Sequence, residues 1–79
     1  MNEMFNAFLN GMITVIVHTD MRMHFYWDSA DRSSHVIFSY DGVKNETKIP
    51  DDGFNYEDAK QKVAKQFQEF LGQLEGVNQ

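Results

Sequence analysis

Three histidines offer the widest range of chemistry in this sequence, because imidazole titrates near neutral pH and binds transition metals. His18, His24 and His35 fall in segments with strand-like composition, and alternation places all three on one face of the expected sheet. Their spacing matches no zinc-binding motif, and Arg22 lies beside His18 in the expected hairpin, where its charge opposes a cation. We therefore expect surface histidines, with no metal site and no cofactor.

The carboxylates are the second group of chemically capable side chains. Most of them lie in predicted turns, whereas acid–base catalysis needs paired groups in a cleft. The acidic segment 51–58 has oxygen ligands suited to calcium, but its glycine comes too early for an EF-hand and no glutamate closes the loop. The chain contains no G-x-S-x-G elbow, glycine-rich phosphate loop or cysteine. We expect no catalytic residues and a protein that is not an enzyme.

Length and charge restrict the class of protein further. A chain of 79 residues without cysteine is expected to form one domain, residues 1–79, held by a single apolar core. The formal net charge of −5 disfavours binding to nucleic-acid phosphates, which requires a concentrated basic surface. The start of the chain lacks the features of a signal peptide, and its longest apolar run is too short to span a bilayer. These features predict a soluble, cytoplasmic protein.

The elements that position these groups follow from hydrophobic periodicity. In residues 1–10 the apolar side chains share one helical stripe, and Gly11 is expected to end that short helix. From Ile13 to Trp27, apart from a short polar break at Thr19-Asp20, the odd positions are apolar and most even positions are polar. This alternation predicts two strands joined by the loop 19–21, with Val17 opposite Met23.

The second half of the chain has stronger local signals. Asp41-Gly42 between two extended runs, 35–40 and 43–49, predicts a type I′ turn that pairs Tyr40 with Val43. Asn55 is a suitable cap for a helix whose apolar stripe continues to Leu71 or beyond.

The predicted fold class is α+β: a short N-terminal helix, a four-stranded antiparallel meander sheet and a long C-terminal helix (αββββα). Both helices are expected on the face that carries the odd-numbered apolar residues of the first two strands. The expected core comprises Phe5, Phe8, Val15, Val17, Phe25, Trp27, Val36, Phe38, Val63, Phe67, Phe70 and Leu71.

Two surfaces emerge as candidates for partner binding. In a meander, the loop after the second strand and the exit of the fourth lie at one end, so the acidic residues there should gather. We call this set the acidic pole: Asp28, Asp31, Asp51, Asp52, Glu57 and Asp58. The second surface is the outer sheet face, where apolar and aromatic residues interrupt polar positions: Ile16, His24, Tyr26, His35 and Ile37.

The function favoured by these features is a non-enzymatic, acidic protein-binding module that blocks a basic, nucleic-acid-handling partner. Phage-encoded inhibitors of host defence, including anti-CRISPR proteins, are of this general kind, an analogy of size and charge only. The alternative is a self-associating, homodimeric structural or regulatory domain that uses the outer sheet face.

A third alternative is direct binding to RNA or DNA. Ala59-Lys60 followed by Val63-Ala64-Lys65 resembles the last helix of double-stranded RNA-binding domains. The chain lacks the basic loop and the glycine-rich approach to the helix that this family has, which weakens the resemblance.

Overall fold

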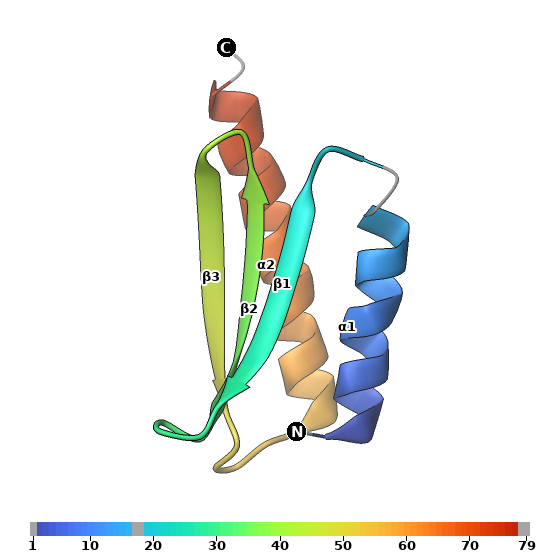
Figure 1. Ribbon diagram of the computed structural model, residues 1–79, viewed down its shortest axis with the longest axis vertical. Helices are drawn as coiled ribbons and strands as arrows, with labels where there is room; N and C mark the ends of the chain where they lie inside the picture. The colour runs from blue at the N-terminus through green and yellow to red at the C-terminus, as the bar shows by residue number, and fades with distance from the viewer. Residues whose placement is uncertain (1, 17–18, 78–79) are drawn as a thin grey trace.

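The computed structural model, which describes residues 2–16 and 19–77, contains two helices and one antiparallel sheet. The elements in chain order are α1 (Glu3–Ile16), β1 (Arg22–Asp28), β2 (Ser33–Tyr40), β3 (Val43–Pro50) and α2 (Tyr56–Val77). The sheet has the order β1-β2-β3. Helix α2 packs against β2 and β3, while α1 runs alongside β1 and also contacts α2 (Figure 1). The α+β class is therefore confirmed.

The prediction of four strands is wrong, because the described part of the chain forms three. Residues 13–16, expected to begin the first strand, continue α1, and Gly11 does not end that helix. Phe5, Leu9 and Ile16 share one helical face and are buried, whereas Val15, predicted to lie in the core, is 73% exposed. Val17 and His18, which were predicted to pair with residues of the second strand, lie outside the described residues.

Thr19, which was predicted to lie in the loop between the first two strands, instead closes α1. The backbone N–H of Thr19 donates to the carbonyl oxygen of Ile16 at 2.8 Å, and its hydroxyl donates to the same oxygen at 2.7 Å. These bonds satisfy a carbonyl that the end of the helix leaves without an intrahelical partner. The β-branched residues of the last turn lower helix propensity by only a few tenths of a kcal/mol each, less than the burial of Ile16 contributes.

The turn and the cap expected in the second half are confirmed. Tyr40 pairs with Val43, and Asp41 and Gly42 both have positive φ, at 47° and 84°, as a type I′ turn requires. The side-chain oxygen of Asn55 accepts the backbone N–H of Asp58 at 3.1 Å, which caps α2.

The core lies between the inner sheet face and the two helices. Its buried apolar residues are Phe5, Leu9, Ile16, Val36, Phe38, Ile49, Ala59, Val63 and Phe70. Phe38, from the central strand, packs against Phe67 and Phe70 of α2 with ring centroids 5.2 and 5.8 Å away. Trp27 and Leu71, which were predicted to be in the core, are 40% and 37% exposed.

A glutamine fastens α2 to the sheet inside this core. Gln66 is 2% exposed, and its side-chain amide donates to the carbonyl oxygens of Val36, at 2.8 Å, and Asn45, at 3.2 Å. These two bonds join α2 to β2 and β3 and fix the helix over the inner face. The outer sheet face is left without a covering helix in the described structure.

Candidate partner-binding surfaces

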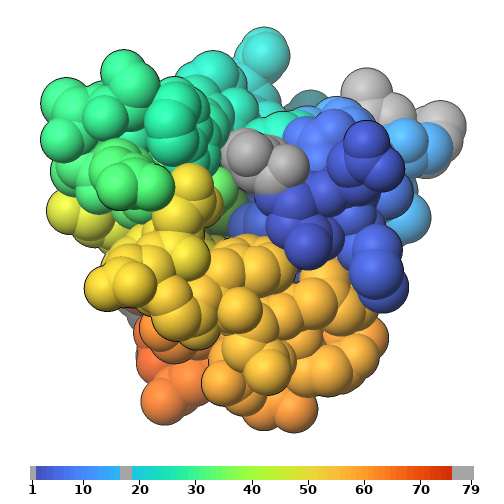
Figure 2. All heavy atoms as spheres, turned by 90° about the horizontal axis from the view of Figure 1, so that it is seen from below, coloured from blue at the N-terminus to red at the C-terminus, as the bar shows by residue number. Residues whose placement is uncertain are grey.

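All six residues of the acidic pole lie at one end of the molecule. The end of β1, the β1–β2 loop, the β3–α2 loop and the first turn of α2 meet there, and α1 begins at the same end (Figures 1 and 2). Glu3, in the first turn of α1, adds a seventh carboxylate. Glu3 could not be assigned to this end from the sequence, because the end of the molecule at which α1 begins depends on how that helix packs.

Three of these carboxylates surround a hollow. Asp31, Asp51 and Asp52, together with Arg32 and Gly53, line an open depression of about 570 Å³. The backbone N–H of Asp51 donates to the carbonyl oxygen of Arg32 at 2.9 Å, which ties the two loops together. A backbone hydrogen bond between two segments therefore holds the shape of the hollow.

The carboxylates of the acidic pole differ in how far the fold already uses them. Asp28 accepts the N–H of Ala30 at 2.9 Å, Asp51 accepts the indole N–H of Trp27 at 2.9 Å, and Glu57 pairs with Lys60 at 3.5 Å. The side chains of Asp52 and Asp58 have no hydrogen bond or ion pair with any residue that the structure describes. These two side chains are the most available to a partner.

Asp31 is the most constrained of the six. Its carboxylate accepts the hydroxyl of Ser33 at 2.6 Å, and its other oxygen lies 3.0 Å from the Lys48 ammonium and 3.2 Å from the His35 imidazole. The hydrogen bond from Ser33 is the main cause that lowers the pKa of Asp31. Desolvation opposes this effect, but the nearby Lys48 and His35 add to it, and the pKa falls to about 2. Asp31 therefore carries its charge at every pH near neutral.

His35 lies on the central strand β2, on the outer sheet face near the acidic pole, and connects that face to the pole. It is 8% exposed, with one ring nitrogen 3.2 Å from Glu46 and the other 3.2 Å from Asp31. The bond to Glu46 and, against the effect of burial, the contact with Asp31 raise the pKa of His35. The Tyr26 ring stacks on the imidazole with centroids 4.7 Å apart and an interplanar angle of 2°.

Four of the five residues predicted on the outer sheet face do lie there. His24 is opposite Ile37, and Tyr26 is opposite His35, across the β1–β2 pair. His24 and Tyr26 are exposed, and Ile37 is half-buried. Ile16 is a correction: it lies in α1 and is buried, because the strand to which it was assigned is part of that helix.

Three side chains that could together bind a metal ion lie where the acidic pole meets the outer sheet face. Asp28, Asp31 and His35 bring potential ligand atoms within 4.8 Å of one another, the one such group among the described residues. The Lys48 ammonium already contacts the Asp31 carboxylate, and its charge opposes a second cation. Hydrogen bonds and the ion pair account for this cluster, so we assign no metal to it.

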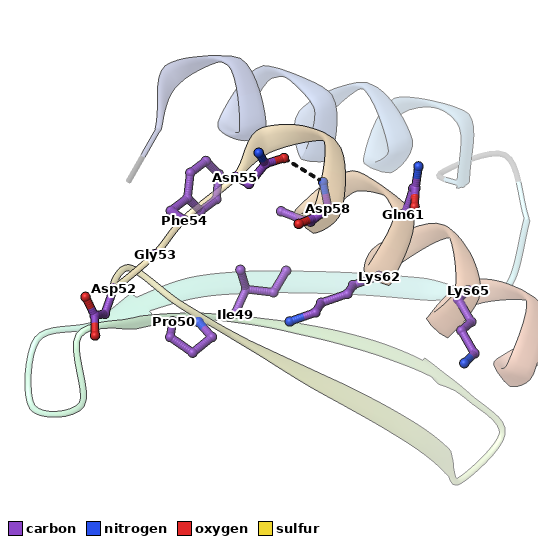
Figure 3. Close-up of a pocket in the computed structure, with 11 residues that line it drawn as sticks. Ile49, Pro50, Asp52, Gly53, Phe54, Asn55, Asp58, Gln61, Lys62 and Lys65 are labelled. Carbon is purple, nitrogen blue, oxygen red and sulfur yellow. Dashed lines mark hydrogen bonds between the residues drawn. The ribbon is translucent and has the colours of Figure 1, made fainter.

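A groove on the other side of the β3–α2 loop marks the limit of the acidic pole. It has a volume of about 420 Å³, and Asp52 and Asp58 line it together with Lys62 and Lys65 (Figure 3). The Lys62 side chain extends over Ile49 toward the end of β3 (Figure 3). The negative surface therefore gives way to a mixed one along α2.

Comparison with protein-family models, curated proteins and solved structures finds no match to this chain. Within the described residues, neither helix has the length and apolarity needed to cross a membrane.

Proposed function

We propose that the chain is a non-enzymatic protein-binding module whose acidic pole occupies a basic surface of a partner protein. The observation that carries this proposal is the gathering of the acidic side chains at one end, with Asp31, Asp51 and Asp52 around one hollow. Surfaces of nucleic-acid-handling proteins are basic, because they must neutralise phosphates. Occupying such a surface would make the module an inhibitor, as phage-encoded anti-defence proteins are.

The charge distribution explains why a basic side chain would be preferred there. In this hollow Asp52, whose carboxylate has no bond within the described structure, can hold a guanidinium or ammonium group through charge-assisted hydrogen bonds, whereas Asp31 is already paired with Lys48. Like charges gathered at one end also steer a basic partner during its approach, and this steering weakens as salt rises. Binding should therefore depend on salt mainly through the association rate.

The alternatives have less support. For nucleic acid, Lys48 and Lys60 are paired with Asp31 and Glu57, and the net charge of the chain is −5. For self-association through the outer sheet face, both Glu46 and Lys48 of β3 are already bound to side chains of the same molecule.

The single tryptophan provides a direct assay, because Trp27 donates to Asp51 at the acidic pole. A synthetic arginine- and lysine-rich peptide without tryptophan is titrated into the protein while Trp27 fluorescence is recorded. We expect a saturable change, with affinity that falls as salt rises.

Matched variants locate the binding surface. Asp52→Asn removes a carboxylate that has no bond within the described structure, and we expect roughly threefold to tenfold weaker binding. Glu69→Gln changes the net charge equally, but at an exposed position in the second half of α2, whose first turn lies at the acidic pole. Equal affinities for the two variants, or binding that does not respond to salt, would contradict the proposal.

A further inference from the structure

Helix α1 presents an apolar surface to solvent as well as to the core. Met4 and Val15 are 61% and 73% exposed, the highest exposures among the large apolar side chains of the described residues. Val15 borders an open groove of about 400 Å³. Its lining includes Ala7, Phe8, Gly11, Met12 and Val15 of α1 and Phe67 of α2.

The positions around the helix show that this surface is a second apolar side. At ~100° per residue, Phe5, Leu9 and Ile16 point to the core, and Met4, Gly11 and Val15 point roughly 120° away from it. The remaining side has the polar residues, including Asn6, Asn10 and Thr14. A helix that only covers a core needs an apolar stripe of about 100°, whereas that of α1 covers roughly two thirds of the circumference.

The charge of the molecule indicates what covers the second apolar side. In a twofold homodimer each surface meets itself, so an acidic surface would meet like charge. Glu3 is the only charged residue between positions 3 and 16, in a chain of net charge −5. The outer side of α1 can therefore meet a second copy without bringing like charges into direct contact. A membrane surface suits it less well, because interfacial helices are rich in lysine and arginine and α1 has neither.

We propose that two copies of this chain associate through α1, with the helices antiparallel and a twofold axis near Gly11. A Cβ atom added at Gly11 would meet nothing within 4 Å, so the surface there is open to close approach. Antiparallel pairing about Gly11 sets Val15 opposite Ala7 of the second copy, a large side chain against a small one. Such alternation lets two helices interdigitate.

This arrangement does not depend on the proposed function of the acidic pole. It does have a consequence for that function, because α1 begins at the acidic pole (Figure 1). Two antiparallel copies would direct their acidic poles in opposite directions. The dimer would therefore be able to bind two basic partners, or two sites on a long one.

Analytical ultracentrifugation over a range of concentrations tests the association. We expect a reversible wild-type dimer and, for Val15→Glu, a dimer dissociation constant raised at least about tenfold, since a carboxylate would be buried without a partner. Asn10→Glu is the control, with the same added charge on the polar side of the same helix. Circular dichroism verifies that both variants keep the fold. A wild-type monomer at every concentration, or equal effects of the two variants, would overturn the proposal.

Cross-linking tests the position of the axis. The chain has no cysteine, so Gly11→Cys creates its only thiol. A disulfide needs Cα atoms about 4.4–6.8 Å apart, which the crossing at residue 11 provides. We expect Gly11→Cys to form a disulfide-linked dimer rapidly under mild oxidation, and Asn10→Cys to do so at least about tenfold more slowly. Equal rates would show that residue 11 does not lie on the axis.

Discussion

Two neighbouring residues, Val15 and Ile16, provide the sharpest test of the fold. The alternating pattern of the sequence predicts a strand with Val15 in the core and Ile16 outside. The structure places both in α1, with Val15 73% exposed and Ile16 5% exposed. The two arrangements therefore predict opposite effects for the substitutions Val15→Ala and Ile16→Ala.

The magnitudes follow from burial and helix propensity. Val15→Ala loses little buried area and gains about 0.5 kcal/mol of helix propensity, so the free energy of unfolding should rise by a few tenths of a kcal/mol. Ile16→Ala leaves a cavity beside the core and should lower that free energy by about 2–4 kcal/mol. For a domain of this size, that loss lowers the melting temperature by roughly 8–30 °C.

Urea unfolding followed by circular dichroism measures both values. Low micromolar protein is used, so that loss of a dimer contact at Val15 does not add to the measured effect. A strand in this segment would produce the reverse order, with Val15→Ala the more damaging change. Observation of that order would refute the helical assignment.

Four further predictions concern single positions. The free energy of unfolding should fall between about pH 4 and pH 2. In this range the unfolded chain binds a proton at Asp31 with a pKa of 3.8, whereas the folded protein binds it only near its lowered pKa of about 2. The free energy of unfolding should also fall above pH 6.5, as His35 loses its proton through its raised pKa; His35→Gln should flatten this alkaline limb in urea titrations at successive pH values. Gly42→Ala should cost about 1 kcal/mol in the same assay, because a Cβ strains the backbone at φ 84°, and an unchanged midpoint would contradict the I′ turn. Phe38→Ala should cost about 3–5 kcal/mol, since its fully buried ring packs on Phe67 and Phe70; a loss under about 1 kcal/mol in thermal unfolding would mean that the ring is not in the core.

The features that the sequence determined by itself depend on local chemistry. The Asp41-Gly42 turn and the Asn55 cap were predicted correctly, because each needs only backbone conformations and hydrogen bonds within four residues. The stripe of α2 likewise identified Val63 and Phe70 as core residues. The placement of the acidic pole at one end required only that consecutive antiparallel strands alternate in direction.

Tertiary structure decided the segment from Ile13 to Ile16. Its apolar residues alternate as in a strand, yet Phe5, Leu9 and Ile16 also share one helical face. The sequence is therefore compatible with both the strand period of 2 and the helix period of 3.6. The helix is favoured because it buries all three residues together beside β1 and α2. This burial depends on contacts between distant segments, so the local sequence pattern does not predict it. The same change moved Val15 from the predicted core to the surface.

Tertiary structure also decided the surroundings of His35. Its contacts with Asp31 and Glu46 join a loop and a neighbouring strand, and Lys48 completes the set from the same strand. The sequence predicted an exposed histidine, because alternation reports only which face a residue occupies. The burial of a side chain on that face depends on the lengths and charges of the side chains on neighbouring strands. Here these side chains bury the imidazole between two carboxylates.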